Sequence, residues 1–236
     1  MSAVRKYASW LQRTPFHPQW LMPLRKVSRH IKVCRGRVLD IGAADGRLSK
    51  QLDPAAEYIS LDYPATAIEL YHTRPLVFAD ACAMPFANAS IDAVACFEVL
   101  EHVTRPDALL EEVARVLVPG GVAEFTMPFF YPIHDAPHDY QRWTRHGWSR
   151  GLARVGLAVE SIEPRGHSLH AAGVTACLGM AGPLQKAGLL KAVLGIPVLL
   201  VAIPMVNLAA WVASQLWPSW DAMSIGYRVL VRKPDA

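Results

Sequence analysis

Cysteines are scarce in this sequence, and their spacing excludes two kinds of stabilised scaffold. Four occur in 236 residues, at Cys34, Cys82, Cys96 and Cys177, and none forms a C-x-x-C pair. Neither a structural zinc site nor a disulfide framework is therefore expected. The fold must instead depend on a hydrophobic core. With 52% hydrophobic residues, the chain has enough apolar side chains for one well-packed domain with an elaboration.

The first part of the chain has no acidic residue and no long apolar run. No Asp or Glu precedes Asp40, whereas nine Lys and Arg residues do. Residues 1–36 are predicted to form a basic helical cover, suited either to an anionic partner or to a solvated helix face. The opening "MSAVRKYASWLQRTPFHPQW" has no apolar core before a small-residue cleavage site. It does not resemble a secretory signal, so a cytoplasmic location is expected.

Short apolar runs alternate with amphipathic stretches along the rest of the chain. Strands are predicted at residues 37–41, 58–61, 76–79, 91–97, 122–127 and 158–162, and in the final "IGYRVLVRK". Helices are predicted in "RPDALLEEVARVLVPGG", which ends in a Pro-Gly-Gly stop, and after the N-cap Thr144. This order predicts an α/β fold with a doubly wound, seven-stranded, mostly parallel sheet. The expected segments are the cover (1–36), a cofactor-binding core (37–166), a hydrophobic helical insertion (167–220) and the last strand (221–236).

A buried strand that enters a tight turn is predicted by "VLDIGAADG", residues 38–46. In an open parallel sheet, ligands lie beyond the carboxyl ends of the strands. Acids end four of the predicted strands, namely Asp40, Asp62, Asp80 and Glu98. Asp62 could accept both hydroxyls of a ribose, which fits a nicotinamide dinucleotide and S-adenosylmethionine equally well. The turn has Ala44 in place of a second glycine and carries the charge of Asp45, which disfavours a pyrophosphate and favours S-adenosylmethionine.

Four motifs, in their order and spacing, resemble those of the class I S-adenosylmethionine-dependent methyltransferases of type 11. They are "VLDIGAADGRLSKQL", "YISLDY", "FADACAMPFANASIDAVACFEVLEHV" and "EEVARVLVPGGVAEFTMP". The resemblance implies a Rossmann-like methyltransferase fold with S-adenosylmethionine as cofactor. The implied contacts are Gly42, Ala43 and Gly46 at the methionine part, Asp62 at the ribose, Asp80 and Ala81 at the adenine, Phe97 and Glu98 beside the methyl group, and in addition Asp40 and Tyr63.

Two clusters of polar residues are candidates for the chemistry. Glu98, Glu101 and His102 have i, i+3, i+4 spacing, so a helix after the fourth strand would present all three on one face. The second cluster is "HDAPHDYQRWT", in the loop after the fifth strand and at the same edge of the sheet. Methyl transfer to a hydroxyl or an amine usually needs a base, and the candidate catalytic residues are His138, His134 and His102.

The E-x-x-E-H pattern with a later His-Asp pair resembles metal-dependent members, including small-RNA methyltransferases and ubiquinone-pathway O-methyltransferases. This resemblance implies a divalent cation bound by Glu98, Glu101, His102 and His138. Such a ligand set suits Mn, Fe, Co or Zn better than Mg. The alternative is that Glu101 and His102 only orient the helix and line the pocket. Arg142 either holds an anionic substrate group or forms a salt bridge within the loop.

Residues 192–220 contain no charged side chain, and this run is longer than the roughly 20 residues of a membrane-spanning helix. A single span is excluded if the final strand returns to the sheet. The remaining interpretations are a monotopic or re-entrant element, a tight hairpin, a buried helical cap or a dimer interface. Pro197 and Pro204 break the run, and three tryptophans crowd its end, as at membrane interfaces. Peripheral contact with an anionic membrane is therefore predicted.

Methyl transfer from S-adenosylmethionine to a small or lipid-linked acceptor, at a hydroxyl, is the expected function. The loop "FFYPIHDAPHDYQRWT" resembles bacterial methyltransferases of polysaccharide and cell-envelope pathways, which favours a glycan or glycolipid acceptor. The alternatives are a catalytically inactive, membrane-associated partner protein that binds S-adenosylmethionine, and a nicotinamide-dependent oxidoreductase. Nucleic-acid binding is not expected because no aromatic-basic stacking pattern occurs. The expected location is the cytoplasm or the cytoplasmic face of the membrane.

Overall fold

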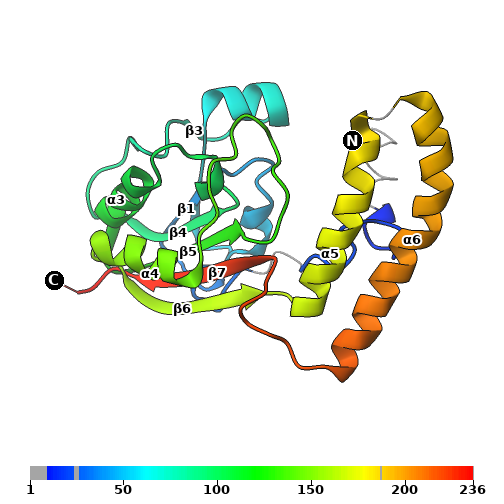
Figure 1. Cartoon of the computed structure of the whole chain (residues 1–236). Helices are drawn as coiled ribbons and strands as arrows, with labels where there is room; N and C mark the ends of the chain where they lie inside the picture. Colours follow the sequence, from blue (N-terminus) through cyan, green and yellow to red (C-terminus); the bar gives the residue numbers. More distant parts are fainter. Residues whose placement is uncertain (1–9, 24–26, 187, 236) are drawn as a thin grey trace. The chain divides into compact units, whose positions relative to one another are not determined.

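A seven-stranded sheet forms the centre of the fold in the computed structural model, which describes residues 10–23, 27–186 and 188–235 (Figure 1). The strand order is β3-β2-β1-β4-β5-β7-β6. The strands are β1 (Arg37–Ile41), β2 (Glu57–Asp62), β3 (Val77–Phe78), β4 (Ile91–Phe97), β5 (Leu117–Pro128), β6 (Ala158–Arg165) and β7 (Gly226–Arg232). Neighbouring strands from β3 to β5 are parallel. The predicted seven-stranded, doubly wound α/β fold is confirmed.

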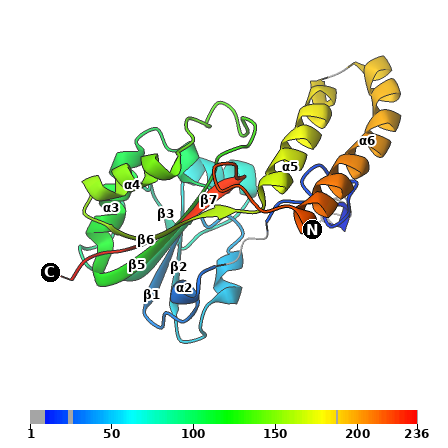
Figure 2. The same ribbon diagram turned by 60° about the horizontal axis from the view of Figure 1, so that its bottom comes forward.

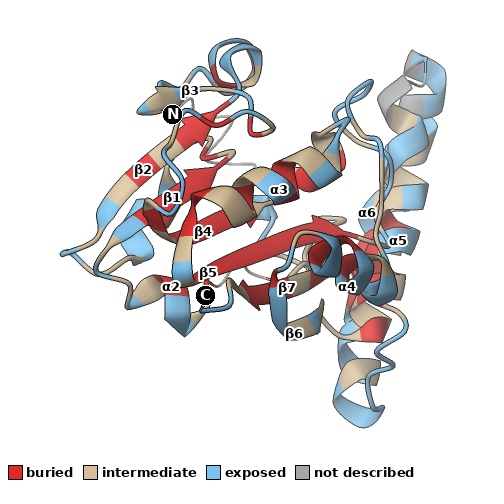
Figure 3. Cartoon of the chain, turned by 90° about the vertical axis from the view of Figure 1, so that its left-hand side faces the viewer, coloured by how far each residue is buried: buried red, intermediate tan, exposed pale blue. Residues whose placement is uncertain are grey.

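The strands at the centre of the sheet are largely buried (Figure 3). Their alternating side chains supply a hydrophobic core on each face of the sheet. In β4, Val94 and Cys96 belong to the core beneath α3 and α4, whereas Ala93 and Ala95 belong to the core beneath α2. The helices are α2 (Arg29–Lys32), α3 (Pro106–Val116), α4 (Arg145–Arg154), α5 (Ser168–Ala181) and α6 (Leu189–Leu216). Single turns of other helix types are η1 (Arg47–Gln51), η2 (Thr66–Tyr71), η3 (Leu100–His102) and η4 (Gly182–Lys186).

The chain reverses its direction across the sheet between β1 and β4. From β1 it continues to β2 and β3 on one side, and then crosses to β4 on the other side of β1. Ile41, near the end of β1, pairs with Leu61 on β2 and with Cys96 on β4. The carboxyl ends of these three strands therefore lie at one edge, at the kind of switch point where open α/β sheets bind ligands.

Several strands differ in length from the prediction, and β5 differs most. β3 contains only Val77–Phe78. β5 starts at Leu117 instead of residue 122, because the Pro-Gly-Gly segment continues the strand after it ends α3. Leu117 pairs with Ile91 and Val122 pairs with Ala93, so a register shift absorbs the intervening residues.

The predicted helical cover over residues 1–36 is only partly helical where the structure describes it. After Leu11, residues up to 21 form successive turns, and the only α-helix in 27–36 is the four-residue α2. Proline explains the turns, since Pro15, Pro18 and Pro23 lack the N–H that a continuous helix needs. The basic residues Arg5, Lys6, Arg25 and Lys26 lie outside the described residues.

The chain divides into two compact units. The sheet unit contains the described residues of 25–129, 133–163 and 227–236. The hairpin unit contains those of 1–24, 130–132 and 164–226, and therefore the antiparallel pair α5 and α6. The segments predicted from the sequence have boundaries at residues 36 and 166. The boundaries of the structural units differ from these because α2 packs with the sheet and the end of β6 groups with the hairpin.

Candidate active site

The turn after β1 has backbone angles that require glycine at its first position. Gly42 has φ +69°, and a Cβ at this position would lie 2.3 Å from a methyl carbon of Val99. Ala44 also has a positive φ, of 45°, and Gly46 one of 66°. The Gly42 N–H donates to Leu61 O on β2 at 2.9 Å. The predicted tight turn is therefore present, and it lies beside the end of β2.

Two carboxylates at this edge are buried and already hydrogen-bonded. Asp62 accepts from the Ala44 N–H at 3.0 Å and from the Tyr63 N–H at 2.8 Å, one bond to each oxygen. Its residue is 4% exposed, and burial raises the pKa of its carboxyl above the ordinary value. Asp40 accepts from the Tyr58 hydroxyl at 2.7 Å. Because each Asp62 oxygen has a second lone pair, the carboxylate can hold the turn and still accept hydroxyl groups.

The expected adenine and methyl-group contacts lie on neighbouring strand ends. Asp80 follows β3, is exposed, and accepts the Cys82 N–H at 2.8 Å, while Ala81 is buried. Glu98 follows β4 with φ 56°, and its carboxylate accepts from the Thr126 hydroxyl at 2.7 Å. Phe97 is half-buried and Tyr63 is exposed. The residues expected to bind the cofactor thus lie in or just after the carboxyl ends of β1, β2, β3 and β4, and their role stays a prediction.

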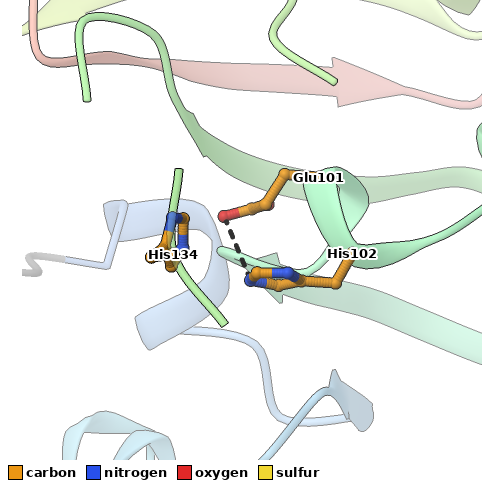
Figure 4. Close-up of side chains that lie close together, drawn as sticks. All are labelled: Glu101, His102 and His134. Atoms are coloured by element: carbon orange, nitrogen blue, oxygen red, sulfur yellow. Dashed lines mark ion pairs between the residues drawn. The ribbon is translucent and has the colours of Figure 1, made fainter. Parts of the chain in front are cut away.

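A second cluster contains Glu101, His102 and His134 (Figure 4). One possible ligand atom from each lies within 4.8 Å of the others, and Glu101 Oε1 is 3.8 Å from His102 Nε2. Glu101 is fully buried, and neither of its oxygens receives a hydrogen bond from another described residue. Burial, reinforced by the negative charge of Glu98, raises the pKa of Glu101 to about 8. The cluster therefore favours a proton or a cation.

Both imidazoles are oriented through their Nδ1 atoms. His102 Nδ1 lies 2.6 Å from the carbonyl oxygen of His138, which can only accept, so this nitrogen carries the proton. His134 Nδ1 lies 3.1 Å from Asp139 Oδ2. The Nε2 atoms are therefore left as acceptors, in the arrangement that suits either a general base or a metal ligand.

The loop after β5 is held on η3 by bonds between residues far apart in the sequence. The Tyr140 N–H donates to Glu101 O at 2.8 Å, and Gln141 Nε2 donates to Leu100 O at 2.6 Å. Arg142 donates to both oxygens of Asp139, and this pairing lowers the pKa of Asp139 to about 2. Of the two interpretations of Arg142, the structure supports the salt bridge within the loop.

The expected helical face with Glu98, Glu101 and His102 is wrong. Glu98 adopts a left-handed conformation, and only a three-residue turn, η3, follows it. Among the described residues, the compact cluster therefore excludes Glu98 and His138 and contains His134 in their place. His138 is exposed, with Nδ1 2.9 Å from the Tyr140 hydroxyl. The sequence places His134 in a loop at the same edge of the sheet, but nothing in it indicates that His134, and not His138, lies beside Glu101.

Comparisons with known proteins agree with this geometry. Residues 39–125 match a family model described as a methyltransferase domain. The chain is similar to a demethylmenaquinone methyltransferase of Renibacterium salmoninarum, with 35% identity over 112 residues, 44% of this chain and 47% of the relative. It is also similar to a ubiquinone biosynthesis O-methyltransferase of Xylella fastidiosa, with 29% identity over 117 residues, 45% and 48% of the two chains. The chain thus spans about half the length of the curated relatives it matches.

Solved structures resemble the chain over a larger part of its length. A S-adenosylmethionine-dependent methyltransferase from Archaeoglobus fulgidus has a TM-score of 0.53 and 17% identity, and the match covers 86% of this chain and 88% of that one. At this level of identity, the likeness concerns the fold.

Proposed function

We propose that this chain is a class I S-adenosylmethionine-dependent methyltransferase that transfers a methyl group from S-adenosylmethionine to a small or lipid-linked acceptor. The match of residues 39–125 to a methyltransferase-domain model supports this proposal. The observation that carries this proposal is the buried Asp62 carboxylate, which is tied to the turn after β1 at the switch point of the sheet. A carboxylate in this position suits a ribose, and the turn is shaped to let a ligand approach its backbone.

The cofactor would be held by the edge of the sheet and would supply an electrophilic methyl group. Asp62 would accept the ribose hydroxyls, and Gly42 and Gly46 would let the methionine part approach the turn. Asp80 and Ala81 would border the adenine. In this proposal, the Glu98 carboxylate, fixed by Thr126, stands beside the reacting carbon.

His134 is the proposed base, in preference to His138 and His102. Its Nδ1 faces Asp139, a carboxylate kept ionised by Arg142, so Nε2 can take a proton from an acceptor hydroxyl. His138 is exposed and contributes its carbonyl to the orientation of His102. A hydroxyl acceptor is also supported by the name of the relative described as a ubiquinone biosynthesis O-methyltransferase.

The same cluster also fits a divalent cation, and this is the second candidate role for it, in which His134 would be a ligand and not the base. Glu101, His102 and His134 would be the ligands, because the buried Glu101 oxygens have no hydrogen-bond partner among the described residues and one possible ligand atom of each side chain lies within 4.8 Å of the others. A cation there would supply Lewis acidity toward an acceptor hydroxyl. Mixed nitrogen and oxygen ligands favour Mn, Fe, Co or Zn.

The acceptor is proposed to be lipid-linked and to be met at the cytoplasmic face of the membrane. The two curated relatives are named for demethylmenaquinone and for ubiquinone biosynthesis, which supports a small, lipid-like acceptor. The glycan or glycolipid acceptor expected from the loop after β5 stays a prediction.

Calorimetric titration of the purified chain with S-adenosylhomocysteine tests the proposed function first. We expect a dissociation constant on the order of micromolar, because the edge of the sheet supplies the ribose carboxylate and the open turn. NAD is the control and is expected to give no heat of binding. Binding of NAD alone would indicate a nicotinamide-dependent oxidoreductase, and heat from neither ligand would contradict the proposal.

Replacement of His134 by Ala tests the assignment of the base. We expect turnover to fall about 100- to 10,000-fold, the usual contribution of general base catalysis, with unchanged affinity for S-adenosylhomocysteine. Turnover is measured as S-adenosylhomocysteine formation with a bacterial lipid extract as the pool of acceptors. His138→Ala is the matched control, since it removes an exposed histidine of the same loop. If only His138→Ala lowers turnover, His138 is the base instead.

A further inference from the structure

Helix α6 is apolar around its circumference and is largely uncovered. The stretch Val193–Leu216 has 24 residues; its most apolar 18-residue window has a mean hydropathy of 2.3, and only 11% of that window is buried. Exposed side chains include Val193, Leu194, Ile196, Val198, Leu200, Val201, Met205, Leu208 and Val212. Figure 3 shows the exposed colour along most of α6. A helix at the surface of a water-soluble unit normally has a polar outer face, and α6 lacks one.

The two helices of the hairpin unit form a closed antiparallel pair, with α5 and α6 side by side in Figures 1 and 2. Three bonds join the start of α5 to the segment after α6. The Ser168 N–H donates to Ser219 Oγ, the Trp220 N–H donates to Ser168 Oγ, and His167 Nε2 lies 3.0 Å from Trp217 O. We call this end the base of the hairpin, and the end at η4 the tip. The chain enters α5 from β6 and leaves α6 toward β7 at the base, so the tip has no direct chain connection to the sheet.

Small residues let the two helices approach closely. A Cβ on Gly173 of α5 would lie 2.9 Å from Ala210 Cβ on α6, and one on Gly195 of α6 would lie 3.0 Å from Leu184 in η4, the turn between the two helices. Helices packed through glycine and alanine are typical of membranes, where close van der Waals contact replaces the hydrophobic effect. The proline residues inside α6, Pro197 and Pro204, are likewise more frequent in membrane helices than in soluble ones.

Polar side chains within the hairpin are paired internally. Asn207 is fully buried and donates to the carbonyls of Pro15 and His17, and the Cys177 thiol donates to its amide oxygen. The Thr175 hydroxyl is exposed but donates to Ala171 O. A hydrocarbon environment requires such internal pairing, because it offers no hydrogen bonds of its own.

Aromatic and basic residues are unevenly distributed in the hairpin unit. Five of the seven tryptophans belong to it, and none lies between Ala171 and Ala210. They are Trp10, Trp20, Trp211, Trp217 and Trp220. Asn207, in the half of α6 nearer the base, donates to the carbonyl of Pro15, which lies between Trp10 and Trp20 in the sequence. Of the charged residues described in this unit, Asp221 is the only acid, against Arg13, Arg165, Lys186 and Lys191. Tryptophans near the base, together with an excess of positive charge in the unit, suit a bilayer that contains anionic lipid.

From these observations we propose that the α5–α6 hairpin inserts tip-first into a lipid bilayer, with the tryptophans at the interface where it enters. From Asn207 to Leu190, α6 extends about 25 Å, close to the roughly 30 Å hydrocarbon core. Lys191, near the tip, can extend its ammonium group toward the opposite headgroups. Insertion, rather than peripheral contact alone, follows from the exposure of α6 on the sides that do not pack against α5. The proposal does not depend on methyl transfer, so vesicle binding and cofactor binding can succeed or fail separately.

Flotation of the full chain with vesicles of phosphatidylcholine and phosphatidylglycerol tests the insertion. The wild type is expected to float and to stay bound in 1 M salt and in alkaline carbonate. Leu200→Lys places a charge on an exposed position at mid-helix and is expected to lower partitioning roughly 100-fold. Leu76→Lys is the matched control, because it makes the same change at an exposed leucine of the sheet unit and is expected to float like the wild type. Circular dichroism checks that both variants fold.

Three results would overturn the proposal. Release of the wild type by salt would indicate an electrostatic surface contact, and a discrete dimer that ignores vesicles would indicate that a second copy covers α6. Equal flotation of Leu200→Lys and Leu76→Lys would exclude α6 from the contact. If Leu200→Lys fails to fold, quenching of the wild-type protein's tryptophan fluorescence by brominated lipids tests the insertion instead. Wild-type tryptophan fluorescence should be quenched more by bromines near the headgroup than by bromines near the chain ends, and no quenching would contradict insertion.

Discussion

Replacing Asp62 by Ala is expected to weaken binding of S-adenosylhomocysteine by about 5- to 150-fold, which corresponds to about 1–3 kcal/mol for hydrogen-bonded groups left without a partner. The carboxylate is buried, and it already holds the turn through the Ala44 and Tyr63 N–H groups. Its removal should therefore loosen the turn as well as the proposed ribose contact. Calorimetric titration measures the affinity.

Asp45→Ala is the matched control for this experiment. Asp45 lies in the same turn, but its carboxylate is exposed and pairs with Arg47 at 2.5 Å. Its loss removes one negative charge without removing the bonds of Asp62, so affinity should change little. A thermal melt separates a loosened turn from general unfolding. Unchanged affinity in Asp62→Ala would exclude Asp62 from the site.

Glu101→Gln is expected to remove a strong dependence of stability on pH. The pKa of Glu101 is about 8 in the folded chain, against an ordinary value of 4.5. Between these values, the unfolded carboxyl loses its proton while the folded one keeps it, so the free energy of unfolding falls as pH rises. The full loss is on the order of a few kcal/mol, or roughly 5–10 °C in melting temperature between pH 5 and pH 8. Glutamine does not ionise, so the variant should lack this decline.

Melting curves of both proteins in a chelator, at pH 5 and pH 8, measure this difference. Glu111→Gln is the control, since it removes an exposed carboxylate from α3. A parallel decline in wild type and Glu101→Gln would show that Glu101 is not the group responsible. Added Mn²⁺ tests the proposed cation at the same time. It should stabilise the wild type at pH 8 more than the variant, and equal effects on the two would argue against Glu101 as a ligand.

The order of the sheet could be predicted because each strand is signalled by neighbouring residues. "RVLDI" and "IDAVACF" are apolar runs that end beside a glycine turn or an acid, and both strands have the predicted bounds. β5 was predicted too short, because glycine and proline normally end a strand, and only pairing with Ile91 extends it to Leu117. The turns after Leu11 follow from the prolines of this segment. The prediction of a helical cover considered its basic residues and not these prolines.

The candidate catalytic cluster could be predicted only in part. Glu101 and His102 are adjacent in sequence, so their proximity follows directly. The i, i+3, i+4 spacing also predicted a helix that would place Glu98 on the same face. The positive φ of Glu98 breaks that helix, and it arises where the chain leaves β4 and bonds to Thr126 on β5. His134 joins the cluster through contacts of the loop with η3 that span 36 to 41 residues. Such contacts leave no local pattern in the sequence.

By itself, the sequence determined the seven strands, the glycine turn, the acids at the strand ends and the apolar character of α6, because hydropathy and turn geometry depend on residues close together in the chain. Only the tertiary structure decided which histidine lies beside Glu101, and that the apolar run folds back on α5. Both results depend on long-range hydrogen bonds and on the close packing of Gly173 against Ala210. Their residues come together only when the whole chain folds.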